Sequence, residues 1–187
     1  MSEPGEVCDE GVVGEIWIQG ASVASHYWHQ PAEGQGARVE LKGEAGLWLR
    51  TGDLGFVREG ELFPTGRLSD LLIVRGHNHH PQDLEQSAGA AHPSLRSGFA
   101  AAFALEGQGT EDVLLVQEVK RDADREELEG ARRAVLQAVA SEQGVRLKEV
   151  LFVRFASLPL TTSGKIRRGA CREAYQDGAL REIKPLG

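Results

Sequence analysis

The sequence has few cysteines, no long apolar run and no excess of positive charge, and each shortage excludes a class of protein. The two cysteines, Cys8 and Cys171, stand far apart and cannot form a disulfide framework, which favours a reducing, cytoplasmic setting. The longest apolar run, Gly98 to Leu105, is much shorter than the ~18–20 residues that cross a bilayer. A formal net charge of −7 disfavours a sequence-independent nucleic-acid binder, which needs a basic face.

Glycine is abundant instead, and its 23 residues mark turns between short elements without forming a repeat. Residues 1 to about 65 contain short strand patterns and no long helical pattern. The strand candidates are Glu15–Gln19, Leu47–Arg50, Phe56–Arg58 and Glu61–Phe63, the last two joined in a hairpin by Glu59-Gly60. This region therefore predicts a small β-structure, the end of a β-barrel subdomain.

The pattern changes after about residue 71, where strands alternate with helices. The strand candidates are Leu71–Val74, Gly98–Leu105, Asp112–Val119 and Glu149–Phe155. The helix candidates are Pro81–Ala91, Asp124–Gln143 before a capping Gly144, and a last helix to about Gln176. The order predicts an α+β lobe with a small sheet flanked by helices, and the boundary falls near residues 66–70.

Three short stretches carry side chains suited to nucleotide chemistry, although each is ambiguous alone. The carboxylate of Thr51–Asp53 suits the vicinal hydroxyls of a ribose, or belongs to an ordinary turn. Arg67 offers a planar fork for phosphate, or pairs on the surface with Asp70 or Glu61. The loop before Lys165 delivers an ammonium that suits a phosphoryl oxygen, or is solvated surface. It is not a phosphate loop, because no glycine stands five residues before its Gly-Lys pair.

The order and spacing of these stretches resemble the adenylate-forming superfamily of acyl-CoA synthetases, luciferases and peptide-synthetase adenylation domains. The resemblance rests on Thr-Gly-Asp, on Gly-Arg fourteen residues after Asp53, and on Pro-x-Thr-x-x-Gly-Lys near the C-terminus. Within that superfamily, Asn78–Glu85 and Gly164–Arg172 are similar to segments of the fatty acyl-AMP ligases. The resemblance covers nearly the whole chain, but only the last third of such an enzyme.

The resemblance implies a role for each matching residue in the ATP-dependent activation of a fatty acid for transfer to a carrier-protein thiol. Asp53 would hold the ribose hydroxyls of ATP and of the acyl-adenylate, and Arg67 would contact ribose and phosphate. Lys165 would bridge the α-phosphate and the attacking carboxylate. Ser69 occupies the hinge position, where the family usually has Asp or Lys, and His77 stands where these ligases commonly have Arg.

The family's phosphate loop, adenine pocket and acyl pocket have no counterpart in the sequence, so we expect a fragment that is inactive alone. The resemblance divides it into the end of the large N-terminal domain (1–65), a hinge (66–70) and a mobile C-terminal lobe (71–187). The ligands of Mg²⁺, which accompanies ATP, would lie outside the fragment. The alternative is a non-enzymatic lobe that docks a carrier protein or completes another chain.

Two further groups of residues have more than one interpretation. The histidines invite a metal site, but they lack a cysteine partner and their spacings fit no standard site, so we expect no metal. They are His26, His29, His77, His79, His80 and His92. The basic cluster of Lys165, Arg167, Arg168 and Arg172 either neutralises phosphates, docks an acidic carrier protein, or is ordinary helix surface.

Overall fold

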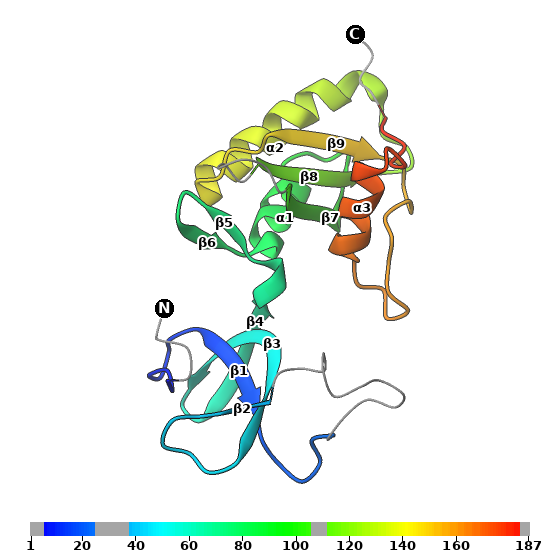
Figure 1. The fold of residues 1–187 in the computed structure, drawn as a ribbon. Helices are drawn as coiled ribbons and strands as arrows, with labels where there is room; N and C mark the ends of the chain where they lie inside the picture. The colour runs from blue at the N-terminus through cyan, green and yellow to red at the C-terminus, as the bar shows by residue number, and fades with distance from the viewer. Residues whose placement is uncertain (1–5, 25–37, 106–111, 184–187) are drawn as a thin grey trace. The chain divides into compact units, whose positions relative to one another are not determined.

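The structure is a computed structural model that describes residues 6–24, 38–105 and 112–183 (Figure 1). The chain divides into two compact units, Met1–Ser69 and Asp70–Gly187. Each unit has its own sheet structure, and all three α-helices of the described residues belong to the second unit. The two units are described separately below.

The first unit is a four-stranded antiparallel sheet built around one long strand. Strand β3 (Leu47–Arg58) pairs with β1 (Gly14–Ile18), with β2 (Arg38–Glu40) and with β4 (Glu61–Arg67). The turn from β3 to β4 passes through Glu59 and Gly60, whose φ angles are 53° and 79°. Two consecutive residues with positive φ are the geometry of a tight two-residue hairpin, so the predicted hairpin is confirmed.

The prediction of two separate strands at Leu47–Arg50 and Phe56–Arg58 is wrong, because β3 is continuous over 12 residues. The glycine between the two segments, Gly52, adopts a left-handed φ of 73°. The pairing of β1 with β3 shifts register at the same place, between Glu15 and Trp17. A bulge of this kind bends a strand while its pairing continues on both sides. The glycine therefore kinks the strand where the sequence predicted its end.

The second unit contains a small hairpin and a three-stranded mixed sheet. The hairpin pairs β5 (Leu72–Val74) with β6 (His77–His79), a strand that the sequence patterns did not predict. In the larger sheet β8 (Asp112–Val119) lies between β7 (Leu95–Leu105), which is antiparallel to it, and β9 (Glu149–Val153), which is parallel. The helix α2 (Leu128–Gln143) makes the crossover that the parallel pair requires.

The three-stranded sheet is covered by helices on both faces, as Figure 1 shows. Side chains alternate along β8, so that Val113 and Leu115 face the core formed with α1 (Pro81–Ala90) and α2. Leu114 and Val116 face the opposite core, which is completed by α3 (Arg168–Gln176). This arrangement confirms the α+β class that the sequence predicted.

Several element boundaries depend on polar side chains that the patterns did not reveal. The Asp124 carboxylate accepts from the Glu126 N–H (2.9 Å) and starts a 3₁₀ turn, η2 (Arg125–Glu127), so α2 begins four residues later than predicted. Gly144 ends α2 with a left-handed φ of 68°, which confirms the predicted cap. Strand β9 ends at Val153, two residues before the predicted Phe155.

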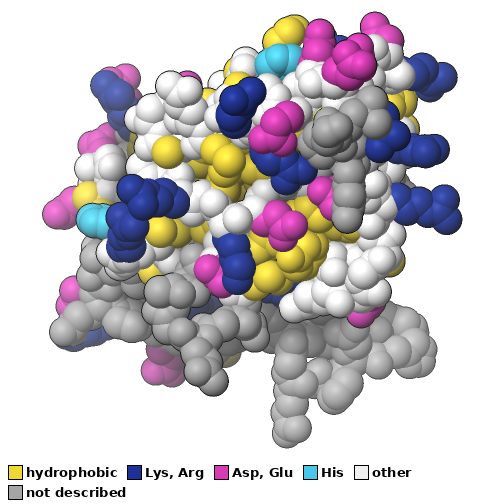
Figure 2. Space-filling model, turned by 90° about the horizontal axis from the view of Figure 1, so that it is seen from above, with side chains coloured by type: hydrophobic (Ala, Val, Ile, Leu, Met, Phe, Trp, Pro, Cys, Tyr) yellow, Lys and Arg dark blue, Asp and Glu magenta, His cyan; other side chains and the backbone are white. Residues whose placement is uncertain are grey.

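One face of the molecule is mixed in charge and in polarity. On the face shown in Figure 2, basic and acidic side chains lie among one another around exposed hydrophobic atoms. None of the described helices is long and apolar enough to span a membrane.

Candidate active site

Two of the predicted nucleotide-binding residues, Asp53 and Arg67, are direct neighbours in the first unit. They form a cross-strand pair between β3 and β4, and Arg67 Nε lies 3.1 Å from Asp53 Oδ1. Their side chains are 44% and 68% exposed, so each still presents polar atoms to solvent. The surface pairing of Arg67 with Asp70 or Glu61 is not the one observed. The arrangement joins a carboxylate and a guanidinium on one accessible edge.

The backbone before Asp53 is held by a threonine. Thr51 Oγ1 donates to the Ile16 carbonyl of β1 (2.7 Å) and accepts from the Asp53 N–H (3.0 Å). Since Gly52 between them is left-handed, the segment turns sharply and both hydrogen bonds fix that turn. The Thr-Gly-Asp spacing therefore orients Asp53 within a continuous strand.

Sequence reasoning missed Glu15, which supports the same turn from β1. Its carboxylate accepts from Arg50 Nη2 (2.7 Å), Trp17 Nε1 (3.0 Å) and the Gly52 N–H (3.2 Å). Burial alone raises the pKa of Glu15, but these hydrogen bonds and the Arg50 charge outweigh it, so the pKa lies below its usual value. The available signal was a polar residue at the start of an otherwise alternating strand.

A shallow hollow of about 460 Å³ in the first unit is lined by Arg67 but not by its partner Asp53. Its lining combines a carboxylate, two guanidinium groups and backbone, and it extends to the predicted hinge residue. The lining residues are Glu15, Arg50, Thr51, Gly52, Arg67, Leu68 and Ser69. Arg50 and Arg67 therefore line one open depression, and a guanidinium can donate two hydrogen bonds to a phosphate.

The predicted catalytic lysine, Lys165, lies in the second unit on an exposed loop between β9 and α3. Leu160 and Ile166 form a β-bridge that closes the base of the loop. Thr161 N donates to the Lys165 carbonyl (2.7 Å), and Thr161 Oγ1 accepts from the Lys165 N–H (3.0 Å). Gly164, with φ of 81°, provides the left-handed turn before the lysine. The backbone of Lys165 is thus ordered while its ammonium is exposed.

A group that we call the Arg168 clamp anchors the C-terminal side of this loop. It consists of Arg168, Glu85 and Asp70: Arg168 Nε and Nη2 donate to the two Glu85 oxygens (2.6 and 2.7 Å), and Nη1 to Asp70 Oδ2 (3.2 Å). Hydrogen bonding to Glu85 raises the pKa of Arg168. Arg168 of the predicted basic cluster is therefore committed to carboxylates. The clamp links α3 to α1 and to the residue that follows Ser69.

The structure gives no catalytic or metal-binding arrangement to the described cysteine and histidine candidates. Cys171 is fully buried on α3, and burial raises the pKa of its thiol to about 11, so it is not an activated nucleophile. Within the described part of the chain, no three His, Cys, Asp or Glu side chains gather as a metal site would require. His26 and His29 lie outside the described residues.

Comparison with known proteins decides the family. Residues 69–185 match the model of the Disco-interacting protein 2-like AMP domain, which is more than half of the chain. The chain belongs to this AMP-domain family. The matched segment contains the Lys165 loop and the whole Arg168 clamp.

The relatives of this AMP-domain chain are fatty-acid ligases. It is 43% identical over 180 residues to the medium-chain-fatty-acid–[acyl-carrier-protein] ligase JamA of Moorena producens. It is 39% identical over 181 residues to the long-chain-fatty-acid–AMP ligase FadD28 of Mycobacterium tuberculosis. These alignments cover 92% and 90% of the AMP-domain chain.

Solved structures agree with this assignment. The AMP-domain chain superposes with a TM-score of 0.76 and 34% identity on a structure from a study of fatty acyl-adenylate ligases of E. coli and L. pneumophila. That match covers 95% of the chain. The chain spans 30% of the length of this structure, of JamA and of FadD28. The family and the fold are therefore established for a part of such an enzyme.

Proposed function

We propose that the chain is the C-terminal catalytic portion of an ATP-dependent fatty acyl-AMP ligase. In the first half-reaction the fatty-acid carboxylate attacks the α-phosphorus of ATP, forms the acyl-adenylate and releases pyrophosphate. In the second, a thiol attacks the acyl carbon, forms a thioester and releases AMP. The observation that carries this proposal is the coexistence of the Asp53–Arg67 pair and the ordered Lys165 loop in a chain related to JamA and FadD28.

The Asp53–Arg67 pair is suited to the nucleotide in both half-reactions. Each Asp53 oxygen can accept from one ribose hydroxyl, and the Arg67 guanidinium keeps donors for ribose or phosphate oxygens. Because both side chains are more than a third exposed, a ligand can replace solvent without breaking a buried pair. The backbone support from Thr51 lowers the ordering cost of binding.

Lys165 is suited to adenylation because negative charge builds on the α-phosphate oxygens as the carboxylate attacks. An ammonium at that point stabilises the transition state more than the ground state. Its exposed position on an ordered loop leaves the ammonium accessible to a bound nucleotide. The backbone hydrogen bonds of Lys165 restrict the range of positions that the loop can adopt. Lys165 takes no part in thioester formation in this scheme. Its loss should therefore slow the first half-reaction and spare the second.

Ser69 is the proposed hinge between an adenylating and a thioester-forming arrangement of the two units. It is an exposed residue at the boundary between Met1–Ser69 and Asp70–Gly187. A carrier protein bearing a thiol on a phosphopantetheine arm is the acceptor that we propose, since JamA is named for ligation to acyl-carrier protein. The fatty acid itself would be held by the part of the enzyme that this chain does not span.

The test is fatty-acid-dependent ATP–pyrophosphate exchange by the complete polypeptide that contains residues 1–187. We expect exchange with medium- or long-chain fatty acids and none with amino acids. Lys165→Ala should reduce it by about 10²–10³-fold, whereas Lys120→Ala, at an exposed lysine after β8, should leave it unchanged. Exchange with amino acids alone, or equal exchange by both lysine variants, would contradict the proposal.

A further inference from the structure

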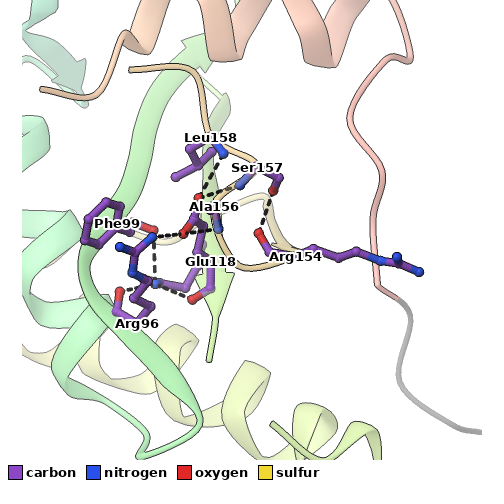
Figure 3. A network of polar contacts seen from close by, with 8 residues as sticks. Arg96, Phe99, Glu118, Arg154, Ala156, Ser157 and Leu158 are labelled. Carbon is purple, nitrogen blue, oxygen red and sulfur yellow. Dashed lines mark hydrogen bonds and ion pairs between the residues drawn. The ribbon is translucent and has the colours of Figure 1, made fainter. Parts of the chain in front are cut away.

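Glu118, near the end of β8, is a buried carboxylate that the proposed mechanism leaves without a role. Its side chain is 1% exposed, although acidic residues are rarely buried unless they are fully partnered. Its partners come from two directions, from β7 and from the segment that follows β9. Figure 3 shows them converging on the carboxylate from both sides.

Three consecutive backbone N–H groups donate to this carboxylate. Ala156 N lies 3.0 Å from Oε2, and Ser157 N and Leu158 N each lie 2.9 Å from Oε1. Ala156 has a φ of 58°, a left-handed conformation that costs energy for a residue with a side chain. Consecutive N–H groups around such a residue form a concave anion-binding nest. Glu118 supplies the anion from within the chain.

Arg96 completes the charge balance on the other side of the carboxylate. Its Nη1 lies 2.6 Å from Glu118 Oε2, and its guanidinium lies over the rings of Phe99 and Phe155. The neighbouring Arg154 instead extends its side chain away from the cluster (Figure 3). Glu118 therefore pairs with one cation, Arg96, and accepts from three backbone N–H groups. These contacts hold the backbone of residues 156–158 in one place.

The segment held by Glu118 is the base of the Lys165 loop. Leu158 is buried in the same core cluster as Cys171 of α3, and Lys165 follows seven residues later. Pro159, next to Leu158, accepts from the Arg167 N–H (3.0 Å), and Leu160 bridges to Ile166. The contacts run from the Glu118 carboxylate, through residues 156–158, to the bridged residues Leu160 and Ile166 at the base of the Lys165 loop.

We propose that Glu118 is a positioning residue that fixes the base of the Lys165 loop and thereby the placement of the lysine during adenylation. This inference rests on the proposed function of Lys165. A small misplacement of a catalytic group can cost about 10²-fold in rate. Glu118 does not touch the reacting groups, so its effect is confined to the half-reaction that uses Lys165.

Glu118→Gln in the complete polypeptide tests the proposal, because it keeps the size of the side chain. One glutamine oxygen can still accept from Ser157 and Leu158, but the new amide must face Arg96 and the Ala156 N–H, which are donors. Hydrogen exchange is expected to quicken about tenfold at the amides of residues 156–158. The amide of Lys148, the residue before β9, donates to the Val113 carbonyl of β8, and its exchange should be unchanged.

Two half-reactions are then measured separately: acyl-adenylate formation from ATP, and thioester formation from supplied acyl-adenylate. We expect Glu118→Gln to slow the first by about 10–100-fold and the second by less than about threefold. Val139→Ala, which removes buried volume from α2 in the opposite core, controls for lost stability and should spare both. If Glu118→Gln does not fold, Arg96→Gln removes one donor and should give a milder effect of the same kind.

Lys165→Ala is measured in parallel to separate two failures. If it abolishes adenylation but Glu118→Gln does not slow it, positioning by Glu118 is refuted while the proposed function stands. If Glu118→Gln slows both half-reactions equally, its role is structural and the proposal is again refuted. If Lys165→Ala leaves adenylation intact, the role of Lys165 in the proposed function fails, and the inference with it.

Discussion

Removing the cation of the Arg168 clamp should destabilise the second unit far more than removing an exposed arginine of the same helix. Arg168→Met keeps the length of the side chain but leaves Glu85 and Asp70 without their shared partner. The side chains of Arg168, Glu85 and Asp70 are 19%, 12% and 29% exposed, so water can only partly replace the lost hydrogen bonds. Glu85 would keep one donor, the Ala102 N–H at 2.9 Å.

The magnitude follows from two independent arguments. Two short charge-assisted hydrogen bonds contribute about 1.5–3 kcal/mol each, and breaking a buried ion pair costs about 3–5 kcal/mol. Because the clamp is not fully buried, we expect a loss of about 2–4 kcal/mol in the free energy of unfolding. With a urea dependence of about 2 kcal/mol/M, the middle of the usual range, the unfolding midpoint should fall by roughly 1–2 M.

The assay uses urea unfolding of the 187-residue chain followed by circular dichroism at 222 nm. That signal reports the second unit, since all three described α-helices lie there, whereas the three tryptophans precede residue 66 and report the first. Arg172→Met, at an exposed position on α3, is the matched control and should change stability by less than about 0.5 kcal/mol. Equal midpoints for the two variants would refute the clamp's contribution.

A double-mutant cycle separates the pair from its surroundings. Glu85→Gln removes the charge that Arg168→Met leaves unpaired, so the double variant should be more stable than the sum of the single losses predicts. We expect an interaction energy of about 1–3 kcal/mol between these two sites. Strict additivity would show that the two side chains act independently.

Three further outcomes are expected. In the complete polypeptide, Asp53→Ala should raise the KM for ATP about tenfold with a smaller change in kcat, since a ribose contact exists in ground and transition states; a change confined to kcat contradicts this. Ser69→Pro fixes φ near −65° and should impair one half-reaction while sparing the other; equal slowing of both, in folded protein, would exclude Ser69 as the hinge. Since burial raises the pKa of Cys171 to about 11, about 0.1% of it is thiolate at pH 8. A disulfide reagent should therefore modify Cys8 first, and modification of native Cys171 at a similar rate would contradict its burial.

Local patterns predicted the elements whose formation depends on nearby residues. Pro81 in the first turn of α1, the Glu59-Gly60 hairpin and the left-handed Gly144 all follow from backbone preferences that operate over a few residues. The continuity of β3 did not follow, because a glycine in a strand either ends it or kinks it. The pairing of β3 with β1 on both sides of Gly52 decides between these outcomes.

The candidate site residues could be predicted where they belong to a short sequence motif. The residues that hold those motifs in place could not, because they contact them from far away in the sequence. The family resemblance implied that Asp53 and Arg67 both bind the nucleotide, and the structure places them in cross-strand contact, while their roles stay predictions. Glu118 binds backbone groups 38–40 residues later, and Arg168 binds a carboxylate 83 residues earlier. In the sequence, the contact of Glu118 is indicated only by the presence of a charged residue in the apolar strand β8.

The measurement that tests the central proposal most directly separates the two half-reactions in the complete polypeptide carrying Lys165→Ala. Acyl-adenylate formation from fatty acid and ATP, and acyl transfer from supplied acyl-adenylate to an acceptor thiol, are followed on the same preparation. The account predicts that adenylation falls by about 10²–10³-fold while acyl transfer stays within about threefold of the unaltered enzyme. Near-normal adenylation, or an equal loss of both steps in folded protein, would contradict it.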